Sequence, residues 1–423
     1  MNVGEPGPVT RELLRDYFVQ AAKPREQWRV GMEIERMGRD ATSGRPIPYA
    51  GAQASVRGVL EDYQARRGGD PILEAEHLIG LDAKWGSITL EPGGQVEWSS
   101  RPATTLDELH RELAAHFDAL DATGATLGIR WLQEAVDPEL SVSEMPWMPK
   151  ARYRIMAPFL GARGKLAHRM MTQSAAIQVA FDYADPEDWK RKFLAASLLS
   201  PVATALFANS SRVDGRDSGY ASFRQAIWDQ TDPDRCRLPR IVFEPGFGIE
   251  SWLDWILAVP TIFRHRARGL VPAGGPPFHE LVNLRDCDAI RWEDWETHVS
   301  TIFTEVRSYT YIEVRSADLQ PSARAFSVPA LWTGLLYDDD ALSEILELCA
   351  PWGRYETWVD AMNTAARRGL DGRVDPWDLR ELATRVLAIS RRGLTAAACV
   401  SDRDAAAAHL DGLARARELS PTG

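Results

Sequence analysis

Cysteine and histidine are scarce in this sequence, and neither is spaced as in a familiar site. The 423 residues include four cysteines and eight histidines, and no two cysteines form a C-x-x-C pair. A disulfide framework and a zinc knuckle are therefore not indicated. The sequence also lacks H-E-x-x-H and G-x-S-x-G, which gives no support to a zinc protease or a serine hydrolase.

Basic tracts and long apolar runs are also missing. The chain has 49 Lys and Arg against 60 Asp and Glu, a net charge of −11, and its basic clusters are short pairs such as Arg391-Arg392. This is not the charge footprint of a nucleic-acid-binding protein. No stretch reaches the roughly 18 uncharged apolar residues of a membrane span, and the N-terminus has no apolar signal core. The sequence therefore predicts a cytoplasmic protein with neither nucleic-acid nor membrane partners.

The usual nucleotide-binding loops are absent too. "GARGK" (161–165) lacks the P-loop spacing and the following Ser or Thr, and "GFG" (246–248) lacks the third glycine of a dinucleotide fingerprint. An acidic protein can still bind a nucleotide if magnesium lies between its carboxylates and the phosphates.

The elements that are present alternate between helices and strands. Helix starts are predicted at Thr105 with Glu108, a capping box, and at Asp185-Pro186 and Asp375-Pro376, where Asp would be the N-cap. The alanine-rich segment 401–423 is predicted to form a helix that frays at its end. Because strand-like runs lie between the helices, the sequence predicts an α+β fold in which distant strands form one sheet.

One such run, "SITLEPGGQVEW" (87–98), predicts two strands joined by a tight connection. Pro92 favours an extended residue before it, and the two glycines after it permit backbone angles that other residues resist. Because strand side chains alternate between faces, Glu91, Gln95 and Glu97 are expected on one polar face.

Three more runs alternate in the same way. They place apolar residues on one face and acids, amides or arginine on the other, at Glu33 and Glu35 in "VGMEIER", Gln178 and Asp182 in "IQVAFDY", and Glu313 and Arg315 in "YTYIEVR". If these strands share a sheet, five glutamates converge on one surface.

Such a surface needs cations, because neighbouring carboxylates raise each other's pKa and repel. Oxygen ligands without His or Cys favour magnesium, or manganese, over zinc, and Arg315 would suit a phosphate oxygen. The alternation therefore predicts a metal–nucleotide surface. Solvated strand faces are the alternative interpretation, and the pattern names no substrate.

Eight blocks, taken together, resemble the glutamate–cysteine ligase family in its plant and proteobacterial branch. They follow the family order from about residue 10 to about residue 400: "GMEIERM", "LEPGGQVEWSS", "PKARYRIM", "MMTQSAAIQVAFDY", "TALFANSS", "FRQAIWDQTDPDR", "FTEVRSYTYIEVRSAD" and "PALWTGLLYDDD".

The resemblance implies one glutamine-synthetase-like catalytic domain over 1–423, with its core at about 10–400. Its sheet would be curved, antiparallel and wrapped by helices, with about six strands, a usual number. The implied reaction uses ATP and Mg²⁺ to make γ-glutamyl phosphate, which cysteine then attacks. The partners would be ATP, glutamate and cysteine, and the chain would be a monomer or a homodimer.

The resemblance also assigns roles to individual residues. Metal ligands would be Glu33, Glu35, Glu91, Glu97 and Glu313, with Gln95 in support. Arg224 and Arg315 would be catalytic, with Arg224 on the amino-acid substrate and Arg315 on phosphate. Weaker nucleotide candidates are Arg152 and Lys165. Substrate-pocket candidates are Gln173, Gln178, Tyr220 and Trp228. Surface charge is the alternative for Arg152 and Lys165, and core packing for Trp228.

The chain departs from the family at a few positions. Gln173 and Ala180 stand where relatives typically have arginine and asparagine, and Leu319 and Gln320 stand where they usually have glycines. Such changes can redirect specificity, because a site built for one polar group rejects analogues that lack it. A ligase that uses a different amine or acid, for instance in secondary metabolism or an ergothioneine-type pathway, is therefore one alternative. A catalytically weak binding homologue is the other.

Overall fold

The computed structural model describes residues 9–267, 269–282, 284 and 289–419. The α-helices are α1 (Arg11–Val19), α2 (Val56–Arg67), α3 (Leu106–Leu127), α4 (Ala151–Gly161), α5 (Ala167–Gln173), α6 (Pro186–Phe207), α7 (Phe223–Trp228), α8 (Ile249–Ala258), α9 (Phe278–Val282), α10 (Trp292–Val299), α11 (Ser322–Ala325), α12 (Ser327–Leu336), α13 (Asp339–Leu348), α14 (Tyr355–Arg368), α15 (Leu379–Ala396) and α16 (Arg403–Ala416). The strands of the main sheet are β1 (Val30–Arg36), β3 (Asp70–Glu74), β4 (His77–Ala83), β5 (Gly86–Leu90), β6 (Val96–Ser100), β8 (Ala176–Phe181), β13 (Val306–Ser308) and β14 (Ile312–Asp318). Short two-stranded pairs are made by β2 (Gly38–Asp40) with β7 (Ile129–Trp131), β9 (Arg212–Val213) with β10 (Arg216–Asp217), β11 (Phe263–Arg266) with β12 (Gly269–Pro272), and β15 (Arg373–Val374) with β16 (Trp377–Asp378).

One antiparallel sheet organises the described chain. Its order is β13-β14-β8-β1-β6-β5-β4-β3, eight strands where about six were expected. The expected α+β class with a large antiparallel sheet is confirmed, and strands far apart in sequence pair as predicted. Glu33 on β1, for example, lies between Ser99 on β6 and Gln178 on β8.

The unexpected strands are β3, β4 and β13. Four consecutive residues of β4, from Leu78 to Leu81, are buried, so its sequence shows no alternation. β3 is the outer strand, mostly exposed, with a register shift between Ile72 and Leu73. The run "YTYIEVRS" was expected as one strand from residue 309, whereas β14 begins at Ile312 and pairs with β13 as a hairpin.

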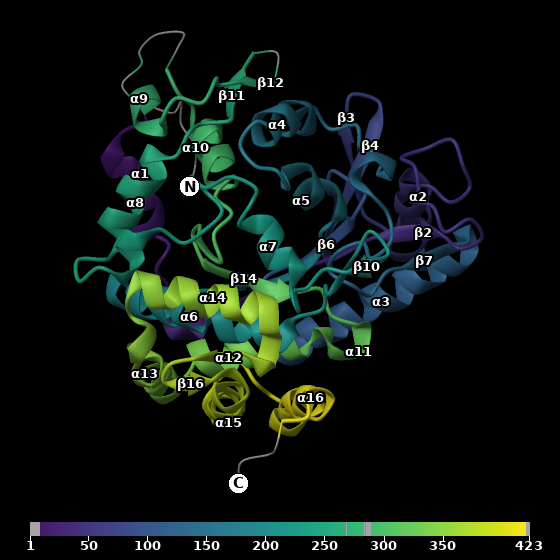
Figure 1. Ribbon diagram of the computed structural model, residues 1–423. Coiled ribbons are helices and arrows are strands. Elements are labelled where there is room, and N and C mark those ends of the chain that lie inside the picture. The colour runs from purple at the N-terminus through teal and green to yellow at the C-terminus, as the bar shows by residue number, and fades with distance from the viewer. Residues whose placement is uncertain (1–8, 268, 283, 285–288, 420–423) are drawn as a thin grey trace.

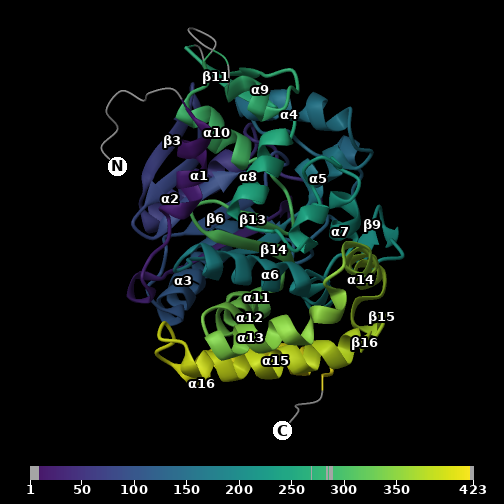
Figure 2. The same cartoon turned by 90° about the vertical axis from the view of Figure 1, so that its left-hand side faces the viewer.

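The two faces of the sheet have different neighbours. Helices α3, α6 and α12 contact the sheet strands from one side, and the C-terminal helices α13 and α15 lie beyond them (Figures 1 and 2). The buried apolar residues of the alternating strands include Met32, Ile34, Trp98 and Val179. Helices α4, α5, α7 and α10 lie on the other side, over the predicted polar residues (Figure 2).

The predicted helix starts are confirmed at two of three positions. The Thr105 hydroxyl accepts from the Glu108 amide at the start of α3, and the Asp185 carboxylate accepts from two amides at the start of α6. The start at Asp375 was wrong. Residues 373–378 form a small hairpin, and α15 begins at Leu379 because the Asp378 carboxylate accepts from the amides of Arg380 and Glu381.

This placement of the cap gives a stability prediction. Asp378→Ala is expected to lower the free energy of unfolding by about 1 kcal/mol, because two amide donors of α15 lose their acceptor. Asp375→Ala is the matched control, with an expected change below about 0.5 kcal/mol. Urea unfolding curves measure both, and equal losses would contradict the assignment.

No helix in the described ranges is long and apolar enough to cross a lipid bilayer. Cys236, Cys349 and Cys399 are free thiols, and Cys287 lies outside the described residues.

Candidate active site

Two glutamates of β1 stand on the polar face of the sheet. Met32 and Ile34 are buried on the opposite face, so Glu33 and Glu35 alternate with them as predicted. A Glu33 carboxylate oxygen accepts from Gln178 Nε2 at 3.1 Å, and Glu35 accepts from the amide of Ala176 at 3.0 Å. The central strand therefore carries two half-buried acids bound to its neighbour β8.

Glu91 and Glu97 come from the predicted pair of strands around Pro92. Glu97 pairs in register with Glu35 and accepts from Thr89 Oγ1 at 3.0 Å. Gly94 has φ +87°, and a Cβ on Gly93 would lie 2.2 Å from the carbonyl oxygen of Thr172. The Pro-Gly-Gly connection is therefore required both for the turn and for its close approach to α5.

Gln95 lies in the same connection and contributes support. Its side-chain amide donates to the carbonyls of Met171 and Ser174, and its side-chain oxygen accepts from Gly93 N. Gln95 thus ties the turn bearing Glu91 to the end of α5.

Glu313 on β14 is buried between two arginines. Its Oε2 accepts from Arg307 Nε at 2.7 Å and from Arg315 Nη1 at 3.3 Å. Arg315 also donates to the side-chain oxygen of Gln178. Glu313 therefore forms hydrogen bonds with two arginine side chains, Arg307 and Arg315.

A cleft covers this polar face. Its lining includes Glu33, Glu35, Glu91, Glu97, Gln95, Gln178, Arg152, Trp228, Arg307 and Arg315. An adjoining hollow shares Glu33 and Gln178 and adds Glu313, Ala180 and Asp182. The five predicted glutamates therefore line two hollows that share Glu33 and Gln178.

The electrostatics of the acids divide them into two kinds. Burial, with repulsion from Glu97 and Glu313, raises the pKa of Glu33 to about 8. Burial and Glu91 raise the pKa of Glu97 to about 7, and the pKa values of Glu35 and Glu91 are raised as well, with burial as the main cause. Burial acts against ionisation of Glu313 also, but Arg307 and Arg315 outweigh it and lower its pKa.

The four acids with raised pKa values offer donor atoms of the kind that bind a divalent cation. Their donor set is all oxygen, which magnesium and manganese prefer. In the described ranges, however, no three His, Cys, Asp or Glu side chains are grouped closely enough to hold one ion. A cation here would take part of its coordination from the phosphates of a nucleotide or from water, as magnesium commonly does.

Two of the predicted cations lie near one aromatic ring. The Cζ atoms of Arg224 and Arg315 lie 5.9 and 6.0 Å from the Trp228 ring centroid. Arg224 is buried, and its Nη2 donates to the carbonyl of Arg315 at 3.3 Å. Trp228, which lines the cleft, therefore lies close to two guanidinium groups.

Arg152 lies on α4 over the same cleft. It donates to Ser300 Oγ at 3.4 Å and stacks on Phe263.

Four predicted site residues, Arg224, Gln173, Tyr220 and Lys165, do not line the cleft or the adjoining hollow. Arg224 lines a separate small hollow with Trp228 and Arg315, which also line the cleft. Gln173 is fully buried and donates to the carbonyl of Leu140. Tyr220 stacks under Arg367 and against Phe223. Lys165 is exposed in the turn between α4 and α5. The structure therefore does not bring Gln173, Tyr220 and Lys165 together with the residues that line the cleft.

Sequence reasoning missed Arg307, Lys150 and Asp318. A signal for Arg307 was present, because "EVRS" occurs twice, at 305–308 and 313–316, and the β13–β14 register puts Arg307 opposite Glu313. Lys150 donates to the carbonyl of Leu90 at 3.1 Å, beside Glu91. No local pattern marked Lys150 or Asp318, since their partners come from distant parts of the chain.

Comparison of this chain with known proteins shows the family to which it belongs. Residues 29–416 match the model of glutamate-cysteine ligase family 2. This chain belongs to the glutamate–cysteine ligase family. The resemblance read from the sequence is thereby confirmed.

Named relatives are plant ligases. Glutamate–cysteine ligase B, chloroplastic, of Oryza sativa subsp. japonica is 36% identical over 398 residues, covering 92% of this chain and 78% of that protein. The chloroplastic enzymes of Medicago truncatula and Arabidopsis thaliana are each 35% identical over 92% of this chain and cover 76% and 74% of their own lengths. Among solved structures, the complex between the prokaryotic ubiquitin-like protein Pup and its ligase PafA aligns with TM-score 0.41 at 11% identity. That alignment covers 96% of this chain and 64% of the other.

Proposed function

We propose that this protein joins the γ-carboxylate of glutamate to the amine of cysteine in an ATP-dependent reaction, giving γ-glutamylcysteine. The observation that carries the proposal is the combination of a family match over 29–416 with five glutamates converging on one polar sheet face. The named relatives are glutamate–cysteine ligases.

The reaction has two steps. A γ-carboxylate oxygen of glutamate attacks the γ-phosphorus of ATP, the bond to the β,γ-bridging oxygen breaks, and ADP leaves with that electron pair. The cysteine nitrogen then attacks the acyl carbon of γ-glutamyl phosphate, the carbon–oxygen bond to phosphate breaks, and the nitrogen gives up a proton.

The residues of the cleft, with Arg224 from the small hollow beside it, can divide the steps between them. Arg224 is assigned to a carboxylate of the acid substrate, with Trp228 as a wall of that pocket. Arg315 is assigned to the transferring phosphoryl group, because its guanidinium lines the cleft beside Gln178. Arg152 is a candidate for a nucleotide phosphate. Magnesium would be held jointly by phosphate oxygens and by one or two at a time of Glu33, Glu35, Glu91 and Glu97, and when bound it neutralises phosphate charge.

Metal removal gives a direct prediction. Activity is expected to fall below about 1% in excess EDTA and to return with Mg²⁺ or Mn²⁺, because the oxygen donors suit these ions. Mg²⁺ alone is also expected to raise the thermal midpoint, since an ion bound only by the folded state stabilises it. Undiminished turnover in EDTA would contradict the metal assignment.

The test of the proposed function is ADP release by the purified protein with ATP, Mg²⁺ and glutamate, with each common amino acid added singly. Product mass is determined for every positive. A γ-glutamyl product with cysteine alone is the expected result. ATP hydrolysis without any coupled product would contradict the proposal.

One observation favours a second candidate, a ligase for another amine or acid. Ala180 lines the hollow beside Glu33 and Glu313, so the departure from the family lies within the site. A coupled product with a different amine or acid would support this candidate. Gln173, the other departure near the strand, lies outside the hollow and offers it no support.

A further inference from the structure

Asp318 is a buried carboxylate beside Arg224, which lines a small hollow that shares Trp228 and Arg315 with the cleft. It is 1% exposed at the end of β14. Its Oδ2 accepts from the amide of Asn209 at 2.9 Å and from Ser210 Oγ at 2.7 Å, and its Oδ1 accepts from Ser222 Oγ at 3.0 Å. Burial raises the pKa of this carboxyl, whereas Arg224 and the three donors, which come from two separate segments, favour its ionised form.

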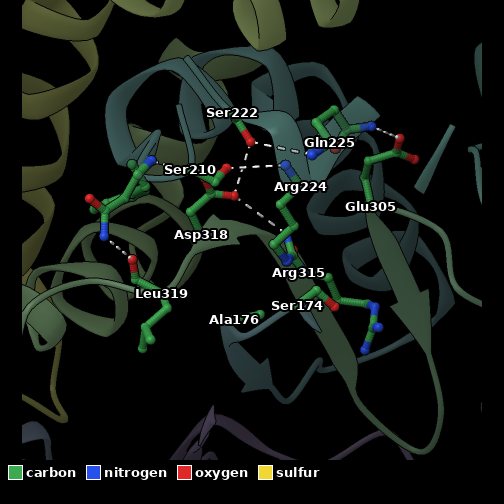
Figure 3. Close-up of polar contacts among 12 residues, drawn as sticks. Ser174, Ala176, Ser210, Ser222, Arg224, Gln225, Glu305, Arg315, Asp318 and Leu319 are labelled. Atoms are coloured by element: carbon green, nitrogen blue, oxygen red, sulfur yellow. Dashed lines mark hydrogen bonds and ion pairs between the residues drawn. The ribbon is translucent and has the colours of Figure 1, made fainter. Parts of the chain in front are cut away.

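The same two serines bind the start of α7. Ser210 Oγ accepts from the amide of Arg224 at 3.1 Å, and Ser222 Oγ accepts from the amide of Gln225 at 3.3 Å (Figure 3). Each hydroxyl gives its only hydrogen to Asp318 and receives one from α7. Asp318 therefore sets the direction of both hydroxyls and, through them, the position of the first turn of α7.

Asp318 also faces the Arg224 side chain itself. The distance from Arg224 Nη1 to Asp318 Oδ1 is 3.9 Å, too long for a hydrogen bond but close enough for attraction (Figure 3). Arg224 is 3% exposed, and its buried Nε has no hydrogen-bond partner among the described residues. A buried guanidinium with an unfilled donor and only a distant carboxylate retains capacity for an anionic ligand.

We infer that Asp318 is a positioning residue, which fixes the Arg224 guanidinium for a carboxylate of the acid substrate. The substrate part of this inference rests on the proposed function. Asp318 acts in two ways, by fixing the Arg224 backbone through two serines and by attracting its side chain. An amide could not replace it, because one end of an amide is a donor and would oppose a serine hydroxyl that is already donating.

The experiment compares Asp318→Asn with the full-length parent protein in two measurements. The first is the KM for glutamate, cysteine and ATP, with kcat. About a tenfold rise in the glutamate KM is expected, with the other two constants nearly unchanged, because one buried hydrogen-bonded charge is lost. The second is a crystal structure, in which Arg224 is expected to leave its present position. In an Arg224→Lys background, Asp318→Asn is expected to add little to the glutamate KM.

Two further variants separate positioning from general loss of structure. Ser210→Ala removes one donor and keeps the carboxylate, so it serves if Asp318→Asn does not fold, with a smaller rise in the glutamate KM expected. Asp294→Asn is the matched control, because Asp294 is also buried and accepts from backbone amides of Arg291 and His265, apart from α7.

The outcomes for the two proposals differ. Equal changes in all three KM values, or an unmoved Arg224 in the Asp318→Asn crystal structure, would overturn the positioning role. An inactive parent protein would overturn the proposed function instead, and the position of Arg224 in the variant would still decide whether Asp318 fixes it.

Discussion

Glu33→Gln is expected to lower kcat/KM for glutamate by at least about 100-fold, a typical loss for one electrostatic group in an active site. Glu33 lines both the cleft and the adjoining hollow and stands between β6 and β8, so it is central to the converging acids. Glutamine has nearly the same shape but no charge for a cation. Steady-state kinetics over a range of Mg²⁺ concentrations measures the loss.

The stability of the same variant is expected to move in the opposite direction. Without metal, Glu33 is a half-buried acid repelled by Glu97 and Glu313, so a neutral side chain removes an unfavourable interaction. The metal-free thermal midpoint of Glu33→Gln is therefore expected to equal or exceed that of the parent. Glu381→Gln, on the surface of α15, is the control for loss of a glutamate charge, with no effect on turnover expected. A variant that keeps its activity, or loses it by unfolding, would refute the assigned role.

Arg39→Met is expected to lower the free energy of unfolding by about 3–5 kcal/mol, the usual range when one partner of a buried ion pair is removed. Arg39 and Asp137 have side-chain exposures of 2% and 1%. Two nitrogens of Arg39, Nη2 and Nε, donate to Asp137 Oδ2 at 2.6 and 3.1 Å. Methionine fills much of the volume but leaves the Asp137 carboxylate without its cation.

The control is the same substitution in an exposed pair. Arg101 and Asp82 are each 52% exposed, so Arg101→Met is expected to change stability by less than about 1 kcal/mol. Urea denaturation of both variants supplies the comparison. If the two losses were equal, burial of the Arg39 pair would not be what makes it important.

Alternation predicted the polar face well because the strands around it are half-buried. On β1 and β6, apolar residues must point into the core, which leaves Glu33, Glu35 and Glu97 on the other side. The same rule fails for β4, whose middle is buried on both faces, and for β3, which is mostly exposed. The family resemblance supplied the rest of the fold class, and physical pattern alone would not have done so.

Pocket residues were harder to predict than strand faces. Gln173 comes directly before Ser174, whose carbonyl accepts from the Gln95 side chain, yet the Gln173 side chain donates to the carbonyl of Leu140. The end of α5 packs against the loop that contains Leu140, and sequence spacing does not locate this loop. The start of α15 was misplaced by three residues because Asp375-Pro376 and Asp378 both carry cap-like signals. Asp378 is the N-cap in the structure, because its carboxylate accepts hydrogen bonds from two amides of α15. Such choices depend on tertiary contacts, whereas alternation depends only on the next residues in the chain.

The outer strand β3 bears on how copies of this chain can associate. An exposed sheet edge offers unpaired amides and carbonyls to any other strand, which invites aggregation. Here the edge contains Pro71, which has no amide hydrogen to donate, and the register shift at Ile72 and Leu73 interrupts a straight line of donors. Asp70 and Glu74 add charge at its two ends. The sheet is therefore ill suited to grow by adding a second molecule's strand at β3.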